Sequence, residues 1–284
     1  MYLIFCHVLR LDEQTQIKVT DIAHILSIAK DYILFKCIAK PSSGHGVHSP
    51  MVYDFTRAVI GNRNNYDQPN EVEWLRNWQI DSSISVGPSD YGAGSRFTNR
   101  SEKLGTVIKR SSVSPKHGAF LYRLAKWSNS KNILELGTSV GISAMYLASA
   151  NPDNMVLTLE GDWQRAELAQ NAFDLFNFKN IKLIEGDFEQ GLNEALSLLP
   201  TLDLVFFDGN HKAEPTLRYF KHCLKYVHEN TIFVFDDIRW SREMHKAWDV
   251  IAKHQSVSVS VDLFHLGVVF FRKGIFKQHF KINF

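Results

Sequence analysis

Apolar and polar positions follow two alternating periods in the second half of the chain, from Val113 onward. Compact apolar runs without helical period predict strands at 132–137, 155–160, 181–185, 202–208 and 231–236. The segments around these runs predict helices at 116–127, 142–149, 163–176, 188–198, 214–227 and 242–253. Strands separated by helices at this rhythm indicate a parallel sheet that is covered on both faces.

Near the C-terminus two strands follow each other without a helix between them. In 257–263 apolar residues alternate with Ser258, Ser260 and Asp262, which predicts a half-exposed edge strand. The run 268–271 is apolar throughout and predicts a more buried strand, and the alternating tail 276–284 predicts an added edge strand. We therefore expect an α/β fold with a Rossmann-like doubly wound sheet of seven strands, mostly parallel, that ends in an antiparallel C-terminal hairpin.

Residues 1–112 lack this rhythm and predict a helical N-terminal extension to a ligand-binding domain at 113–284. Periodicity and capping signals predict helices at 20–40, 50–60, 69–79 and 101–111. The Ser- and Gly-rich segment 82–99 includes DYGAGSRF at 90–97, which indicates either a lid over a site or a disordered connector. The sequence leaves open whether the extension is a lid, a substrate-selecting wall or the interface of a homodimer.

Composition narrows the class of protein. The formal charge of +2 argues against a large nucleic-acid footprint, although a local basic patch is compatible with it. Cys6, Cys37 and Cys223 are odd in number and lack ligand spacing, which favours a reducing cytoplasm. Charged residues interrupt the apolar start of the chain, so we expect neither a signal peptide nor a membrane partner. The tail RKGIFKQHFK mixes basic and aromatic residues as a nucleic-acid surface does, and a solvated edge strand explains it equally.

The segment NILELGTSVGISAMYLASA at 132–150 predicts a strand, a tight glycine turn and a helix. In this arrangement the backbone N–H groups at a helix N-terminus meet a ligand. Glu135 lies two residues before Gly137, and a carboxylate there suits a ligand with a positive end better than a pyrophosphate. Because Ser139 and Ile142 occupy the second and third glycine positions of the dinucleotide fingerprint, a nicotinamide dinucleotide is the weaker interpretation.

Acidic residues gather at the predicted carboxyl ends of the strands, where ligands bind in open α/β sheets. They are Glu135, Glu160, Asp187, Asp208, Asp236 and Asp237. Any one of them is explained as the cap of the following helix. Six on one rim favour a ligand site, in which the residue that ends the second strand accepts both hydroxyls of a ribose.

These motifs carry a resemblance to a known family. The segments ELGTSVGIS, GD after the third strand and VFFDG on the fourth resemble class I S-adenosylmethionine-dependent methyltransferases, within them the catechol and caffeoyl-CoA O-methyltransferase group. VSPKHGAFL before the first strand is similar to the segment that closes over the cofactor in that group. The whole chain, including GVHSPMVYDF, FFDGNH and FDDI, also resembles bacterial methyltransferases with a helical N-terminal extension.

The resemblance implies a cofactor, S-adenosylmethionine, and a role for each matching residue. It implies that the methionine part of the cofactor is lined by Gly137, Thr138, Ser139, Gly141 and Ser143, and that Val113 and Ser114 close over it from the other side. It implies that Glu160 holds the ribose and that Asp187 and Phe188 hold the adenine. A sulfonium with an amino-acid tail needs a helix N-terminus for its carboxylate and acidic groups such as Glu135 and Asp208 elsewhere.

For the reaction, metal-dependent relatives hold a divalent cation with two aspartates and an adjacent asparagine. Asp208 and Asp236 match the aspartates, whereas Asp237 stands at the asparagine position. All-oxygen ligands suit Mg²⁺ or Ca²⁺, so a metal site at these three residues is one expectation. His211 and Lys212 are the alternative bases for removing the acceptor's proton.

The sequence thus predicts a cytoplasmic methyltransferase (EC 2.1.1.-) that methylates a hydroxyl of a small-molecule substrate. Two other interpretations stay open. One keeps the cofactor and takes transfer RNA as the substrate. The other is a non-catalytic protein that binds the cofactor.

Overall fold

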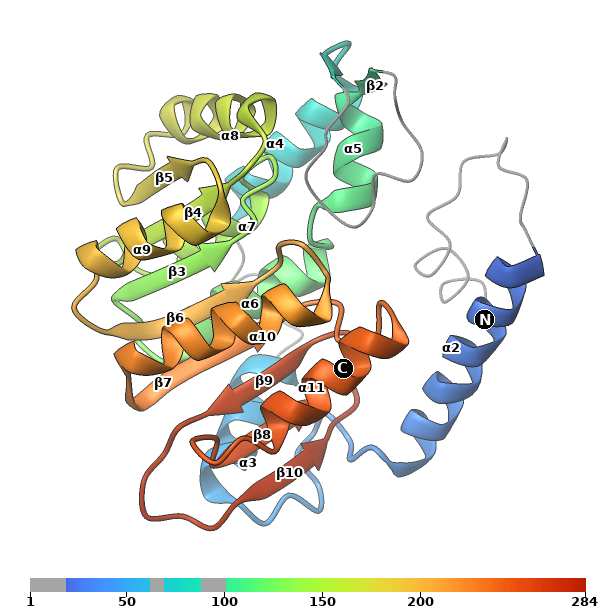
Figure 1. Cartoon of the computed structure of the whole chain (residues 1–284). Coiled ribbons are helices and arrows are strands. Elements are labelled where there is room, and N and C mark those ends of the chain that lie inside the picture. The colour runs from blue at the N-terminus through green and yellow to red at the C-terminus, as the bar shows by residue number, and fades with distance from the viewer. Residues whose placement is uncertain (1–18, 62–68, 88–100) are drawn as a thin grey trace.

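The computed structural model describes residues 19–61, 69–87 and 101–284. Its centre is an eight-stranded sheet with the strand order β10-β8-β9-β7-β6-β3-β4-β5 (Figure 1). The strands are β3 (Asn132–Leu136), β4 (Met155–Glu160), β5 (Ile181–Glu185), β6 (Leu202–Phe207), β7 (Val227–Phe235), β8 (Val259–Asp262), β9 (Gly267–Phe270) and β10 (Gln278–Lys281). The predicted 90–97 loop and Cys6 lie outside the described residues.

The pairing confirms the predicted fold class. β3 to β7 run parallel to one another, and β9 pairs antiparallel with both β7 and β8. The predicted tail strand is also confirmed, because β10 pairs in parallel with β8 and becomes the sheet's edge.

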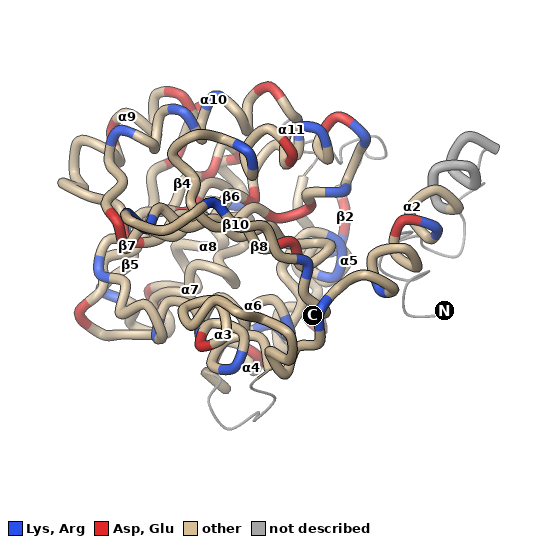
Figure 2. Tube along the Cα trace, turned by 90° about the horizontal axis from the view of Figure 1, so that it is seen from below, with Lys and Arg blue, Asp and Glu red and all other residues tan. Residues whose placement is uncertain are grey.

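Helices cover both faces of this sheet, as the view along it shows (Figure 2). The helices are α2 (Val19–Ile38), α3 (Pro50–Phe55), α4 (Asn70–Asp81), α5 (Leu104–Ser111), α6 (Pro115–Trp127), α7 (Ile142–Ala148), α8 (Trp163–Leu175), α9 (Phe188–Leu198), α10 (Ala213–Cys223) and α11 (Arg242–Ala252). α9, α10 and α11 lie on one face, and α6 and α7 with α3 and α4 lie on the other. Each face has its own apolar core, and the strands contribute alternate residues to both. In the described residues, no helix combines the length and the apolar character needed to span a bilayer.

The half-exposed edge predicted for 257–263 is wrong. Ser258, Ser260 and Asp262 are only 9%, 3% and 6% exposed. The added strand β10 covers the edge, and polar partners satisfy the buried groups. Ser260 Oγ lies 2.6 Å from His279 Nδ1, and Arg239 forms a bidentate ion pair with Asp262 over 2.8 and 2.6 Å.

Three local predictions also need correction. The helix that begins at Pro50 continues as a π-helix over Thr56–Ile60 before Gly61. The segment predicted as loop contains β1 (Ser85–Val86), which pairs with β2 (Glu102–Lys103). The helix predicted to reach residue 227 ends at Cys223, and a 3-10 turn at Leu224–Tyr226 leads directly into β7.

The N-terminal extension packs on helices α6 and α7 of the C-terminal part of the chain through specific contacts. Trp127 Nε1 donates a hydrogen bond to Asp54 over 2.7 Å, and Arg123 Nε donates one to the Val59 carbonyl over 2.8 Å. Tyr146 of α7 donates to Glu73 of α4. Apolar residues of the extension therefore share one buried cluster with the sheet. That the chain divides into two domains between residues 112 and 113 stays a prediction.

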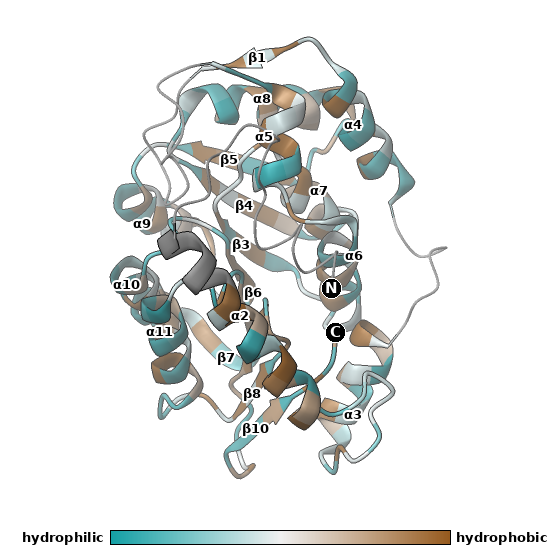
Figure 3. Ribbon diagram, turned by 90° about the vertical axis from the view of Figure 1, so that its right-hand side faces the viewer, coloured by the Kyte–Doolittle hydropathy of each residue, from teal (hydrophilic) through white to brown (hydrophobic). Residues whose placement is uncertain are grey.

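α2 lies across the carboxyl edge of the sheet (Figure 3). Its contact with that edge is aromatic, because Tyr32 and Phe35 pack edge-on against Phe264, with ring centroids 4.8 and 5.4 Å apart. Phe264 lies in the turn between β8 and β9 and has a positive φ of 77°. The predicted helix at 20–40 thus reaches the edge at which ligands of such sheets bind.

Candidate functional site

A glycine elbow joins β3 to α7 at the carboxyl edge. The backbone N–H groups of Gly137 and Thr138 both donate to the Leu159 carbonyl over 3.0 Å, which fixes the elbow to the end of β4. Gly137 has φ +107°, and a Cβ atom there would lie 2.8 Å from the Asp208 carbonyl oxygen. The elbow needs glycine because β3 and the end of β6 approach so closely at this point.

The carboxylate of Glu160 ends β4 and binds the elbow directly. Its Oε2 accepts the Ser139 N–H over 2.7 Å, and its Oε1 accepts the Asp162 N–H over 2.9 Å. Burial raises the pKa of Glu160, and these two backbone donors partly offset the rise. Each oxygen keeps a lone pair, so the group can still accept hydrogen bonds from a ligand.

Glu135 lies below the elbow and is fully buried. Thr158 Oγ1 donates to its Oε2 over 2.5 Å. Burial raises the pKa of Glu135 to about 7, and the hydroxyls of Thr158 and Ser143 partly offset that rise. Within the described part of the chain, Oε1 of Glu135 and Oγ of Ser139 are buried without a hydrogen-bond partner. Two orphaned polar atoms beside one elbow fit a polar ligand that completes the site.

The residues predicted to hold the adenine, Asp187 and Phe188, lie at the start of α9. Asp187 is the N-cap of α9, where its Oδ1 accepts the N–H groups of Glu189 and Gln190 over 2.8 and 3.4 Å. The helix-capping interpretation therefore holds for this oxygen. The neighbouring Phe188 ring lies over Gly209, where a Cβ atom would come within 2.3 Å of it. Phe188 thus stands beside the end of β6.

The segment predicted to close over the cofactor begins α6. Val113 is buried, and Ser114 caps the helix by accepting the His117 N–H over 3.2 Å. α6 packs closely on α7, because a Cβ atom at Gly118 would lie 2.2 Å from the Tyr146 ring. Both residues are thereby held beside the helix that follows the elbow.

A second corner of the edge brings together residues from the ends of β6 and β7. His211 stands between two carboxylates, with Nε2 4.0 Å from Asp208 Oδ1 and Nδ1 3.9 Å from Asp237 Oδ2. Its ring centroid is 5.8 Å from that of Trp240, which is 40% exposed. His211 and Asp237 both have positive φ, and strained backbone of this kind gathers at functional sites. Lys212 precedes α10 and is exposed.

The carboxylates predicted to bind a metal do not gather into one cluster. Asp236 Oδ1 accepts the N–H of Asp237 over 2.8 Å, and Asp237 faces His211. Among the described residues, no group of three or more histidine, cysteine, aspartate or glutamate side chains is arranged to hold a metal ion. The donor set therefore does not fit a metal in this arrangement, and we derive no chemical step through one.

Sequence reasoning missed several residues that shape this edge. Asp162 caps α8 through the N–H groups of Gln164 and Arg165 and also donates its own N–H to Glu160. A helix-start pattern after β4 would have found it. Thr158 gives no such signal, since its role depends on the neighbouring strand. Arg239 pairs with Asp262 beneath the Phe264 ring, and no sequence pattern indicates this role either.

Comparisons with known proteins agree with this geometry. Residues 134–238 match a family model described as a methyltransferase domain. The chain is 34% identical over 136 residues to a catechol O-methyltransferase of Niastella koreensis, a match that covers 45% of this chain and 58% of the relative. A catechol O-methyltransferase of Mycobacterium tuberculosis is 31% identical over 137 residues, covering 46% of this chain and 59% of the relative. The chain thus spans somewhat over half of these relatives.

Two solved structures share the fold. The SAH-bound methyltransferase PaMTH1 of Podospora anserina superposes with a TM-score of 0.57 at 18% identity, covering 79% of this chain and 97% of that one. Cofactor-bound Rv0187 from MTB superposes with a TM-score of 0.52 at 20% identity, covering 77% and 96%.

Residues 134–238 thus match a methyltransferase-domain model, and the chain shares its fold with two solved methyltransferase-like structures. Among curated proteins, the matched segment is similar to catechol O-methyltransferases.

Proposed function

We propose that this protein is an S-adenosylmethionine-dependent methyltransferase that methylates a hydroxyl oxygen of a small molecule. The observation that carries the proposal is the glycine elbow flanked by two buried carboxylates, Glu135 and Glu160, with an orphaned oxygen on the first. A nucleoside with a cationic amino-acid tail supplies a positive charge for one carboxylate and hydroxyls for the other.

The cofactor residues follow from that arrangement. Glu135 would take the ammonium group of the methionine part, and the α7 N-terminus with Ser143 would take its carboxylate. Glu160 would accept the ribose hydroxyls beside its two backbone donors. Phe188 would pack on the adenine, with the free Oδ2 of Asp187 near its edge. Val113 and Ser114 would close the methionine side, and Thr138, Ser139, Gly137 and Gly141 would form its floor.

When bound, the cofactor supplies a methyl group already activated on a sulfonium, so the protein's task is alignment and removal of a proton. We assign the removal of the acceptor's proton to His211. Its two ring nitrogens face Asp208 and Asp237, which would stabilise the imidazolium that forms. Trp240 beside it would bound the space for the acceptor.

Other expectations from the sequence stay predictions. Assistance by Mg²⁺ or another divalent cation at Asp208, Asp236 and Asp237 has no support from the arrangement of these side chains. A homodimer and a cytoplasmic location rest on the sequence alone.

Calorimetry tests the cofactor part of the proposal. Folded protein should bind S-adenosylmethionine and its demethylated product, and no detectable heat with either would reject it. Release of the demethylated product in the presence of a panel of small hydroxyl compounds tests the transfer. Cofactor binding without turnover on any acceptor would favour a non-catalytic, cofactor-binding protein. Turnover on transfer RNA alone would favour a transfer-RNA methyltransferase.

A further inference from the structure

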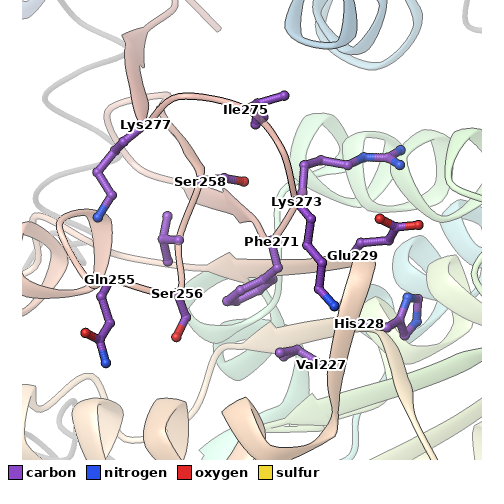
Figure 4. Close-up of a pocket in the computed structure, with 12 residues that line it drawn as sticks. Val227, His228, Glu229, Gln255, Ser256, Ser258, Phe271, Lys273, Ile275 and Lys277 are labelled. Atoms are coloured by element: carbon purple, nitrogen blue, oxygen red, sulfur yellow. The ribbon is translucent and has the colours of Figure 1, made fainter.

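A depression at the opposite edge of the sheet is independent of the proposed methyl transfer. It lies where β7 begins and β9 ends, so it faces away from the elbow and from His211. Its volume is about 700 Å³, within the range of small-ligand and nucleotide sites (Figure 4). The wall is formed by residues 227–229 and 255–258 and, from the loop that follows β9, by residues 271–273, 275 and 277.

Cations dominate the side chains that line this depression. Arg272, Lys273 and Lys277 line it together with a single carboxylate, Glu229. Figure 4 shows Lys273 and Lys277 at the two ends of the loop that borders the depression. His228 is engaged by Asp203, with Nε2 2.8 Å from Oδ1. The lining therefore has a net positive charge that suits an anion.

Lys277 is positioned by the structure. Its Nζ donates to the carbonyls of Lys253 and His254 at the end of α11 over 2.9 and 2.7 Å. An ammonium group has three donors, so one remains for a ligand. Burial lowers the pKa of His254 and of His279, and the charge of Lys277 lowers both further.

An aromatic ring accompanies the cations. Phe276 is 92% exposed, and its neighbour Ile275 is 42% exposed. Gly274, with φ +72°, makes the turn that presents them. An exposed aromatic ring flanked by basic side chains is how proteins stack unpaired bases while they pair the phosphates. A lipid surface would be met by a broader apolar face than these two side chains.

We propose that this depression and the loop 272–277 bind single-stranded nucleic acid. Phosphates pair with Lys273 and Lys277, and a base stacks on Phe276. The exposed side chains of Gln255 and Ser256 offer hydrogen bonds to sugar or base from the opposite wall. The near-neutral total charge does not oppose this assignment, because the cations are concentrated in one loop.

Fluorescence anisotropy with a labelled single-stranded RNA of about ten nucleotides tests the proposal on the full chain. The Phe276→Ala variant should bind about fivefold to a hundredfold more weakly, because stacking on one ring is lost. The Lys273→Gln variant should reduce the slope of log affinity against log salt by about 0.7, the value for one phosphate contact on a single strand. Both residues are exposed, so neither change should disturb folding.

Matched controls lie at the β5 end of the sheet, where Leu175→Ala and Lys179→Gln remove an exposed apolar and an exposed basic side chain. Neither should change affinity. Binding of inorganic phosphate and of AMP tests whether the site recognises a free phosphate or nucleotide instead of a nucleic-acid strand. Both should bind more weakly than the oligonucleotide. Equal binding by all variants, an oligonucleotide no tighter than AMP, or binding to anionic phospholipid vesicles but not to RNA would overturn the proposal.

Discussion

The backbone N–H of Ser139 donates to Oε2 of Glu160 over 2.7 Å, which joins the glycine elbow to the end of the neighbouring strand. The same carboxylate is our proposed acceptor for ribose hydroxyls. Glu160→Gln keeps the shape but removes the charge, so S-adenosylmethionine should bind about tenfold to a hundredfold more weakly. Calorimetry measures this. Glu185→Gln is the matched control, because Glu185 pairs in register with Glu160 on β5 but is exposed. Equal weakening in both variants would contradict the assigned role.

Glu135 predicts a dependence of stability on pH. Burial raises its pKa in the folded protein from 4.5 to about 7, so the folded state holds this proton more tightly than the unfolded chain. Its contribution to the free energy of unfolding should fall as pH rises from 4.5 to 7 and stay low above pH 7. Glu135→Gln should therefore stabilise the ligand-free protein at pH 8 by up to about 3 kcal/mol while weakening cofactor binding. Urea unfolding at pH 5 and pH 8 measures it; an equal effect at both values would refute the prediction.

Gly137 should not tolerate a side chain. Alanine there meets both a positive φ of +107° and the Asp208 carbonyl oxygen at 2.8 Å. Gly186 has φ +130° with nothing within 4 Å of an added Cβ, so Gly186→Ala reports the backbone strain alone, about 1–3 kcal/mol. Gly137→Ala should cost at least about 1 kcal/mol more because of the overlap. Thermal or urea unfolding compares the two variants, and equal losses would mean that the elbow has room.

His211 is expected to affect transfer without affecting cofactor binding. Replacing it with glutamine keeps a polar side chain but removes the base, and general-base catalysis contributes about a hundredfold to ten thousandfold. Product formation on an accepted substrate measures the loss, with S-adenosylmethionine affinity as the control readout. Lys212→Gln is the matched variant and should retain most activity, since Lys212 is exposed. The opposite ranking would move the role of base to Lys212.

Metal removal should leave the reaction rate unchanged. The described carboxylates form no group that could hold a cation, so we expect equal rates with EDTA and with added Mg²⁺. Asp236→Asn should accordingly have a smaller effect than His211→Gln. A rate that collapses in EDTA and recovers with Mg²⁺ would show that Asp208, Asp236 and Asp237 come together when the substrate binds.

The sheet was predictable because its strands are buried on both faces and therefore read as continuous apolar runs, as in 204–207 and 268–271. The burial of Ser260 and Asp262 was not predictable. Their partners, His279 and Arg239, come from other parts of the chain, and alternation alone cannot reveal a covering strand.

The candidate site, too, was predictable from the sequence only in part. Residues at strand ends could be expected near one another, because parallel strands end at one edge, and His211 indeed lies between Asp208 and Asp237. The direction in which each side chain points could not be predicted from the sequence. Asp187 turns one oxygen to its own helix, and the aspartates at 236 and 237 do not join Asp208 in a cluster, since backbone dihedrals such as the positive φ of Asp237 decide where each points.

The pairing of β10 with β8 bears on how the chain folds during synthesis. β10 comes late in the sequence, and just beyond it Asn283 donates its N–H to the carbonyl of Lys40 over 2.8 Å, which closes a loop through nearly the whole polypeptide. The buried Ser260 of β8 acquires its covering strand only when residues 278–281 have left the ribosome. Until then the edge of the nascent sheet at β8 is unpaired and open to other chains, so holding chaperones should associate with the nascent chain until β10 has emerged.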